Sequence, residues 1–328
     1  MKKLLVLVLA LCLVLSMVAS ASALTIAFSQ IGQESDWRTA NTDSVTAAIE
    51  GHEGWEFVYS DGQQKQENQI QALRNFITQG VDYILFTGVV TSGWDEVLTE
   101  VNEAEIPLIL LDRIPDCADK IEYKAAFGGD FPLEGRRQIQ WAAKYLKSIG
   151  RTEDIKVAIM EGATGSDAQI GRTKGNLAAL KKYPWMEVVC RQTAYFSRDE
   201  GQALMESWLK SIDKIDVLIA QNDEMALGAI DAIKAAGKVP GKDIIIVGCD
   251  SVKAAFEAIV AGDMNATIEC TPLYGPFVVK AIEDLEAGVE YDKTVVHPEE
   301  GVYDCVGGIE VEGTTSVLAA DVINERQY

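Results

Sequence analysis

The feature of the sequence that most constrains its fold is a regular alternation of apolar runs with amphipathic segments. The apolar runs are short enough to be strands that are buried on both faces of a sheet. In the first part of the chain they stand at residues 24–29, 55–59, 81–87, 107–111 and 124–127. Between them lie segments with helical spacing, as in Ile70, Leu73, Phe76 and Ile77. This β-α repetition predicts a parallel sheet with right-handed crossovers.

A second β-α series begins after Gly128-Gly129-Asp130, where we expect the chain to cross from one lobe to another. Its apolar runs stand at 155–160, 186–193, 216–220, 243–249 and 266–270. A final helix is predicted over 316–326. Two series of similar size predict an α/β protein with two doubly wound, Rossmann-like lobes, because a single barrel would need eight units closing one ring of about 250 residues.

The first 23 residues have the three parts of a secretory signal peptide. Lys2 and Lys3 precede an apolar run over 4–18, and Ala21-Ser22-Ala23 supplies small residues for cleavage near Ala23. We therefore expect an exported protein, periplasmic in a two-membrane cell and surface-retained or released in others. No other stretch is long and apolar enough to predict a membrane-spanning helix. The net charge of −21 argues against nucleic acid and anionic membranes as partners.

The cysteines predict neither a metal site nor redox chemistry, because no two of them have CxxC spacing. Five follow the signal peptide, namely Cys117, Cys190, Cys249, Cys270 and Cys305. An odd number in an oxidising compartment leaves at least one free thiol. Cys249 and Cys270 lie near the ends of two predicted strands. A disulfide there is one alternative, and two unpaired buried thiols, which we expect, are the other.

An acid and a base stand side by side where the strand at 107–111 ends. In open α/β sheets, ligands bind just beyond the carboxyl ends of the strands. Asp112 offers acceptor oxygens there and Arg113 a planar set of donors, which together suit a polyhydroxylated neutral ligand. The alternative is an ion pair at the rim of the protein, which would contribute little.

Polar or aromatic residues follow nearly every other predicted strand as well. If two lobes face each other with these ends, one cleft receives carboxylates, an amide, arginines and aromatic rings. That set matches a sugar, because polar groups bridge its hydroxyls and an aromatic ring covers its C–H face. Trp37 at a helix start is the most telling residue, with packing in the core as its alternative role.

Catalytic functions are poorly supported by the sequence. His52 and His297 stand in predicted loops without a partner motif, and there is no GxSxG, HExxH or P-loop. No GxGxxG follows the first strand, which argues against a nicotinamide cofactor. Asp112 and Asp250 could in principle be the carboxylate pair of a glycosidase. Nothing in the sequence fixes the distance between them, so this alternative has no support. We therefore expect no catalytic residues and no cofactor.

Several motifs together resemble the type I periplasmic sugar-binding proteins of ABC transporters, and within them the galactofuranose-binding members. They are Phe28-Ser-Gln-Ile-Gly with Glu34-Ser-Asp-Trp-Arg38, Asp61-Gly-Gln-Gln-Lys-Gln-Glu-Asn-Gln-Ile70, Ser92-Gly-Trp94, Pro107 to Arg113, Asn222-Asp-Glu-Met225 and Asp250. The similarity runs from about Leu24 to Pro276. The long block at 61–70 is the most specific part of it.

The resemblance implies which residues bind the sugar. Trp37 would stack on the ring, Phe196 would supply a second aromatic, and arginines and carboxylates from both lobes would hold the hydroxyls. The implied ligand-binding residues are Trp37, Arg38, Asp112, Arg113, Arg172, Phe196, Asn222, Asp250 and Glu269. Some relatives use an amide one position after Glu269, where this chain has Cys270, and this departure leaves the identity of the sugar open.

The resemblance also implies the domain organisation and the role of the chain. A first lobe is expected from 24–128 with 272–300, a second from 129–271 with 301–328, and a three-stranded hinge between them. The chain is expected to be a monomer that captures a galactofuranose-like sugar, or another pentose or hexose, and delivers it to ABC permease subunits. The alternatives are a sugar receptor for chemotaxis or a sensor kinase, and a carbohydrate-acting enzyme.

Overall fold

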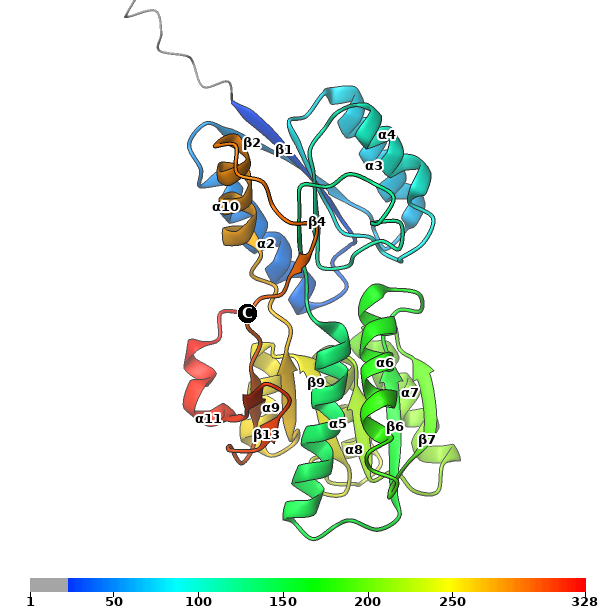
Figure 1. Ribbon diagram of the computed structural model, residues 1–328. Coiled ribbons are helices and arrows are strands. Elements are labelled where there is room, and N and C mark those ends of the chain that lie inside the picture. Colours follow the sequence, from blue (N-terminus) through cyan, green and yellow to red (C-terminus); the bar gives the residue numbers. More distant parts are fainter. Residues whose placement is uncertain (1–22) are drawn as a thin grey trace, which may run out of the picture.

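The computed structural model describes residues 23–328 and consists of two α/β lobes, one above the other in Figure 1. Each lobe is built around its own sheet. The predicted signal peptide lies outside the described residues except for Ala23. Within 23–328, no helix is long and apolar enough to cross a membrane.

The first sheet has the order β11-β5-β4-β3-β1-β2, and all of its neighbouring strands are parallel. Its strands are β1 (Leu24–Gln30), β2 (Trp55–Asp61), β3 (Tyr83–Phe86), β4 (Leu108–Leu111), β5 (Ala125–Phe127) and β11 (Val295–Val296). The helices of this lobe are α2 (Asp36–Glu50), α3 (Gln66–Gln79), α4 (Asp95–Glu103) and α10 (Gly275–Glu286). Residues of β3 and β4 are fully apolar and buried, as expected for strands covered on both faces.

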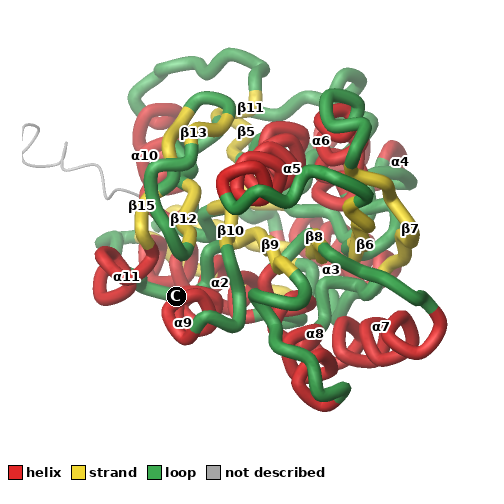
Figure 2. Tube along the Cα trace, turned by 90° about the horizontal axis from the view of Figure 1, so that it is seen from below, coloured by secondary structure: helices red, strands yellow, loops and turns green. Residues whose placement is uncertain are grey.

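The second sheet has the order β15-β12-β10-β9-β8-β6-β7. Its strands are β6 (Ile155–Glu161), β7 (Met186–Thr193), β8 (Val217–Ala220), β9 (Ile245–Asp250), β10 (Ala266–Glu269), β12 (Val302–Asp304) and β15 (Val317–Leu318). Figure 2 shows α5 (Phe131–Ser148) and α6 (Asp167–Leu180) on one side of this sheet, and α7 (Arg198–Ser211), α8 (Asp223–Ala235) and α9 (Lys253–Ala261) on the other. Strand β12 is antiparallel to β10, and the core strands are parallel.

The two doubly wound lobes expected from the β-α alternation are confirmed. The chain passes between the sheets three times, after β5, after β10 and after β11. The expected boundaries at 128/129, 271/272 and 300/301 fall within these connections. These lobe boundaries stay a prediction.

The predicted helix over 316–326 is wrong. This segment forms β15, a short helix α11 (Ala319–Val322) and a 3₁₀ turn (Ile323–Glu325). Val317 pairs with Tyr303 of β12 in the second sheet. Tertiary strand pairing outweighs the weak local helix preference of the segment. The remaining short strands, β13 (Glu310–Val311) and β14 (Thr314–Thr315), form a hairpin of their own.

Candidate ligand-binding site between the lobes

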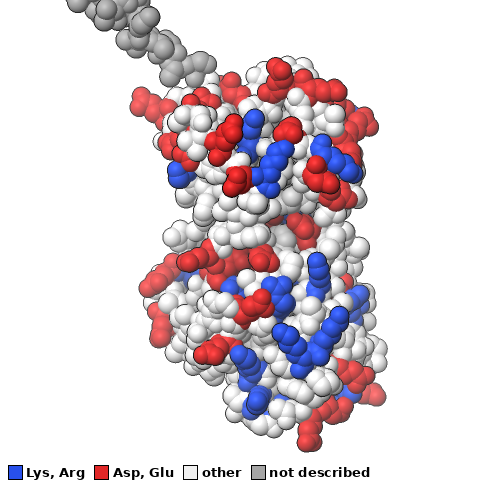
Figure 3. All heavy atoms as spheres, viewed as in Figure 1, with Lys and Arg blue, Asp and Glu red and all other residues white. Residues whose placement is uncertain are grey.

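A small cavity of about 20 Å³ with charged and aromatic walls lies between the two lobes. In Figure 3 the narrow surface between the lobes is largely white with some Asp and Glu beside it, while Lys and Arg gather on the lower lobe. The charges of the site lie inside instead, since Arg38, Arg113 and Arg172 are each at most 5% exposed. The cavity is lined by Glu34, Ser35, Trp37, Arg38, Asp112, Arg113, Phe131, Ala168, Arg172, Phe196, Asn222, Asp250 and Cys270.

On the first lobe, the start of α2 and the end of β4 bring an arginine against two carboxylates. Ser35 caps α2 by accepting a hydrogen bond from the backbone N–H of Arg38 at 3.1 Å, which places Trp37 and Arg38 in the first turn. Arg38 Nη1 lies 2.8 Å from Asp112 Oδ2, and its Nε lies 3.2 Å from Glu34 Oε1. Burial opposes the charge, but the two carboxylates hold the pKa of Arg38 above its ordinary value.

Arg113 is buried beside the same carboxylates but is poorly paired. The nearest oxygens of Glu34 and Asp112 are each 3.8 Å away, and Arg113 Nε has no hydrogen-bond partner in the protein. Burial and the charge of Arg38 lower the pKa of Arg113. Its guanidinium lies 5.2 Å from the ring centre of Phe196, a residue of the second lobe. Arg113 is therefore a donor group held ready for an acceptor in the cavity.

On the second lobe, Arg172 of α6 is the centre of a buried network. Its Nε donates to Glu134 Oε2 at 2.6 Å, its Nη2 lies 3.2 Å from Asp250 Oδ1, and its Nη1 donates to the backbone oxygen of Gln221. Close packing of α5 on α6 makes this possible, since a Cβ atom at Gly135 would lie 2.2 Å from the backbone oxygen of Arg172. The network fixes the guanidinium at the wall of the cavity.

Phe196 and Asn222 complete the wall of the second lobe. The ring of Phe196 fits against Gly162, where a Cβ atom would lie 1.9 Å from the ring. Asn222 caps α8, accepting from the backbone N–H of Met225 at 3.0 Å and donating to the backbone oxygen of Phe196 at 3.1 Å. These contacts leave Asn222 with a single defined orientation at the cavity.

Backbone strain is concentrated at the strand ends that form the cavity. Five residues there have positive φ, namely Asp112 (58°), Tyr195 (55°), Phe196 (64°), Asp250 (111°) and Ser251 (61°). Such conformations cost on the order of 1–3 kcal/mol each and are retained where function requires them. These backbone conformations direct the side chains of Asp112, Phe196 and Asp250 toward the cavity, in directions that a regular extended backbone would not give them.

Asp250 is the cavity carboxyl group with the most perturbed titration. Burial raises its pKa to about 8, and the opposing effect of Arg172 does not compensate. Asp223 lies nearby, and burial together with the charge of Asp250 raises its pKa as well. Near neutral pH, the folded protein therefore holds protons here that the unfolded chain has released.

We expect Asp250→Asn to flatten the pH dependence of stability. Between about pH 4 and pH 8 the folded state binds a proton at Asp250 that the unfolded state lacks, so this group makes the free energy of unfolding fall as pH rises. The asparagine variant should lose up to about 1 kcal/mol per pH unit of that slope. Urea denaturation of both proteins at pH 5 and pH 8 measures the difference. An unchanged slope would contradict the raised pKa.

The family assignment follows from comparison with known proteins. A family model described as periplasmic binding protein domain matches residues 26–272. This chain belongs to that family. The galactofuranose-binding protein YtfQ of Escherichia coli K12 is 39% identical over 290 residues, which are 87% of this chain and 87% of that protein.

Solved structures of this family share the fold of the chain. A Mycobacterium smegmatis protein in complex with β-D-fucofuranose has a TM-score of 0.82 at 43% identity, covering 86% of this chain and 92% of that one. The arabinose-transporter binding protein of Shewanella sp. ANA-3, bound to L-arabinofuranose, has a TM-score of 0.82 at 36% identity, covering 92% and 95%. These likenesses confirm the expected type I periplasmic binding protein fold.

Eight of the nine predicted ligand-binding residues of this periplasmic binding protein line the cavity, and Glu269 does not. Glu269 points away because side chains alternate along β10, so that its successor Cys270 faces the cavity instead. The carboxylate of Glu269 binds Arg326 Nη1 at 2.8 Å and the backbone N–H of Gly301 at 2.8 Å. Glu269 therefore lies outside the cavity lining, and the ligand-binding role of all nine residues stays a prediction.

We expect Glu269→Gln to leave ligand affinity unchanged within about twofold. The change weakens the contact with Arg326, which also donates to the backbone oxygen of Ser251 at 2.8 Å and so ties the end of the chain to the second lobe. The free energy of unfolding should fall by about 1–3 kcal/mol. Urea denaturation and ligand titration of one preparation measure the two effects. A large loss of ligand affinity would show that Glu269 takes part in ligand binding.

Sequence reasoning did not single out Phe131 and Ala168, which also line the cavity, or Glu134 behind them. No strand-end signal marks Phe131 or Glu134, because both stand in the first turn of α5. Cys270, noted above as a departure from the family pattern, lines the cavity as well. Trp37 Nε1 donates to the backbone oxygen of Cys270 at 2.6 Å, so Trp37 joins the first lobe to the connection after β10 as well as lining the cavity.

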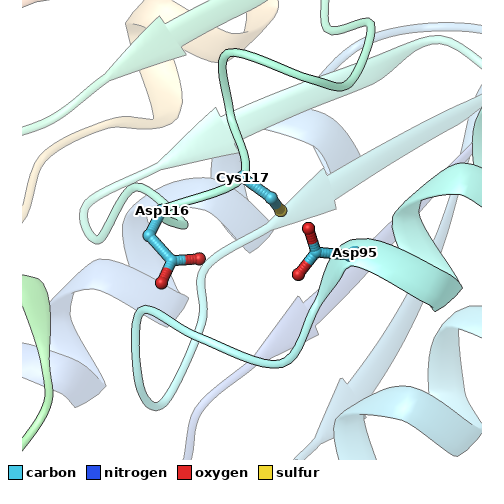
Figure 4. Close-up of side chains that lie close together, drawn as sticks. All are labelled: Asp95, Asp116 and Cys117. Atoms are coloured by element: carbon cyan, nitrogen blue, oxygen red, sulfur yellow. The ribbon is translucent and has the colours of Figure 1, made fainter.

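Two groups of potential metal ligands occur among residues 23–328, and neither is an independent metal centre. Figure 4 shows Asp95, Asp116 and Cys117, in which both carboxylates are exposed and Asp95 lies 3.7 Å from Lys120 Nζ. The second group comprises Glu134, Cys270 and Glu300, and its Glu134 is already paired with Arg172. The five cysteines described are unpaired.

Proposed function

We propose that the chain is an exported solute receptor that closes on a neutral monosaccharide and delivers it to an ABC permease. The observation that carries this proposal is the convergence of side chains from distant segments on one enclosed polar cavity. Trp37 and Arg113 come from the first lobe, and Arg172 and Asp250 from the second. A ligand in the cavity would contact both lobes only when they are closed, so binding would shift the population toward the closed state.

The charges around the cavity favour a neutral ligand. The three buried arginines face the carboxylates of Glu34, Asp112 and Glu134, and Asp250 is protonated near neutral pH, so positive and negative groups balance. A sugar acid or sugar phosphate would place an additional charge inside this balanced set, at a large desolvation cost. A neutral polyol adds none.

Unpartnered polar atoms at the cavity suit hydroxyl groups in particular. Glu34 Oε2 and Arg113 Nε are buried without a hydrogen-bond partner in the protein, while Asp112 Oδ2 is paired with Arg38 Nη1 at 2.8 Å. A vicinal diol can donate to the carboxylate of Glu34 and accept from the guanidinium of Arg113, which would satisfy both unpartnered atoms. The rings of Trp37 and Phe196 lie beside them for the apolar face of a sugar.

The relatives refine the ligand class to sugars with a five-membered ring. Galactofuranose, fucofuranose and arabinofuranose are named for three proteins at 36–43% identity. We therefore infer that this chain binds a furanose, does no chemistry on it, and works outside the cytoplasmic membrane.

Native mass spectrometry of the purified mature protein tests the proposal by weighing any sugar that co-purifies. A thermal-shift panel of L-arabinose, D-fucose, D-galactose, D-ribose and myo-inositol follows. A saturating sugar should raise the melting temperature by about 5–10 °C through linkage. Glucuronate and glucose 6-phosphate serve as charged controls. A shift with the charged sugars, or with none of the compounds, would contradict the proposal.

A further inference from the structure

Outside the cavity, the two lobes also touch directly at the start of α6. The backbone N–H of Thr91 donates to the backbone oxygen of Gly165 at 2.9 Å, and that of Ile114 donates to Asp167 Oδ2 at 3.0 Å. The two donors belong to the first lobe and the two acceptors to the second. None of the four residues lines the cavity. We name this set of four residues the latch.

The first-lobe half of the latch is organised before it meets the second lobe. Thr91 stands in the loop after β3 and Ile114 in the loop after β4. The backbone N–H of Asp116 donates to the oxygen of Thr91 at 2.9 Å, which ties the two loops together. Figure 4 shows Asp116 with its neighbour Cys117, whose side chain turns toward Asp95, and Cys117 is buried. The two donors are therefore held at a fixed separation.

The second-lobe half is fixed by the start of a helix. Ser166 caps α6 by accepting from the backbone N–H of Gln169 at 3.3 Å, so Asp167 occupies the first helical position. A carboxylate is favoured there by the partial positive charge of the helix end. Gly165 has φ of 84°, a left-handed conformation that turns its carbonyl toward Thr91.

We propose that the latch sets how long the closed complex lives without choosing which sugar it holds, and that Asp167 is its main positioning residue. The hydrogen bond from Ile114 ends on a side-chain carboxyl oxygen and is half-buried, which shields it from competition by water. Opening the lobes breaks both latch bonds together with the bonds to the ligand. Weakening the latch lowers the closed fraction and reduces affinity for every ligand by the same factor. This inference rests on the proposed sugar-binding function.

Two variants of the mature protein separate the charge of Asp167 from its side-chain oxygen. Asp167→Ala removes the acceptor, and Asp167→Asn keeps an oxygen without the charge. Glu200→Ala is the matched control, because Glu200 is an exposed acid in the first turn of α7. Stopped-flow tryptophan fluorescence with L-arabinose and with D-fucose gives the association and dissociation rates.

We expect Asp167→Ala to raise the dissociation rates of both sugars by the same factor of about tenfold or more. The association rates should change less than twofold, and Asp167→Asn should be intermediate. A role in ligand contact would instead change the ratio of the two affinities. Equal dissociation rates in wild type and Asp167→Ala, or a changed ratio, overturn the proposal. A melting temperature of the unliganded variant close to wild type shows that the fold is retained.

Small-angle X-ray scattering of the unliganded proteins tests the latch without any sugar. Asp167→Ala should have a larger radius of gyration than wild type and Glu200→Ala, because it favours the open state. If no sugar binds the wild type but this difference is found, the latch stands and the proposed function fails. If sugars bind but neither the rates nor the radius differ, the latch alone fails.

Discussion

Replacing Arg113 with alanine is expected to abolish measurable sugar binding while leaving the fold intact. Arg113 Nε is buried and unpartnered, so a bound ligand would make charge-assisted hydrogen bonds that nothing else in the cavity replaces. Losing them should weaken binding at least about 100-fold. Stability should change by less than about 1 kcal/mol, because the two nearest carboxylate oxygens are as far as 3.8 Å away and both carboxylates keep their contacts with Arg38.

Arg74→Ala is the matched control for this experiment. Arg74 belongs to the same lobe and is paired with Glu96 and Glu100, but it is 48% exposed and far from the cavity. Titration calorimetry and circular dichroism on both variants give affinity and fold. Sugar affinity within a few-fold of wild type in Arg113→Ala would remove Arg113 from the site.

Replacing Arg172 with methionine should destabilise the protein in addition to weakening sugar binding. The substitution keeps an unbranched side chain but leaves the carboxylate of Glu134 buried without its cation and removes the contact of the guanidinium with Asp250. Breaking a buried ion pair by removing one partner costs about 3–5 kcal/mol. Urea denaturation of the unliganded protein measures this loss, which should far exceed that of Arg113→Ala.

Two further variants test whether the loss of stability comes from the buried carboxylate that has lost its cation. Adding Glu134→Gln to Arg172→Met should restore part of the stability, because Glu134 is then no longer a buried charge. Arg136→Met is the control variant. Arg136 lies on α5 and forms a partly exposed ion pair with Glu312, so its loss should lower the free energy of unfolding by about 1 kcal/mol or less. A single Arg172 variant as stable as Arg136→Met would mean that the network contributes little.

Most of the fold could be predicted from the sequence because strand and helix periodicities differ clearly along this chain. The buried runs of β4 and β8 contain apolar residues alone, and glycines end α3 and α9. The segment after 316 could not be predicted in this way. Strand β15 has two residues and forms because β12 offers a hydrogen-bonding partner. A strand that depends on such a distant partner is too short to show a periodic pattern of apolar residues in the sequence.

The site was predictable to the extent that its residues follow strands. Asp112, Asn222 and Asp250 stand at strand ends, where the rule for ligand sites in α/β sheets applies. Glu269 shows the limit of that rule, because a shift of one residue reverses which side chain faces the cavity. Glu134 shows another limit: it acts through Arg172 from the first turn of α5, and nothing in its local sequence indicates a binding site.

The three crossings between the sheets also have a consequence for how the chain folds. Strands β1 to β5 are complete at residue 127, but α10, which packs on α2, and the edge strand β11 come from 275–296. The first lobe therefore stays unfinished until nearly the whole chain is available. Contacts that close so long a loop form slowly. A newly made chain therefore lacks a complete first lobe until residues 275–296 have been synthesised.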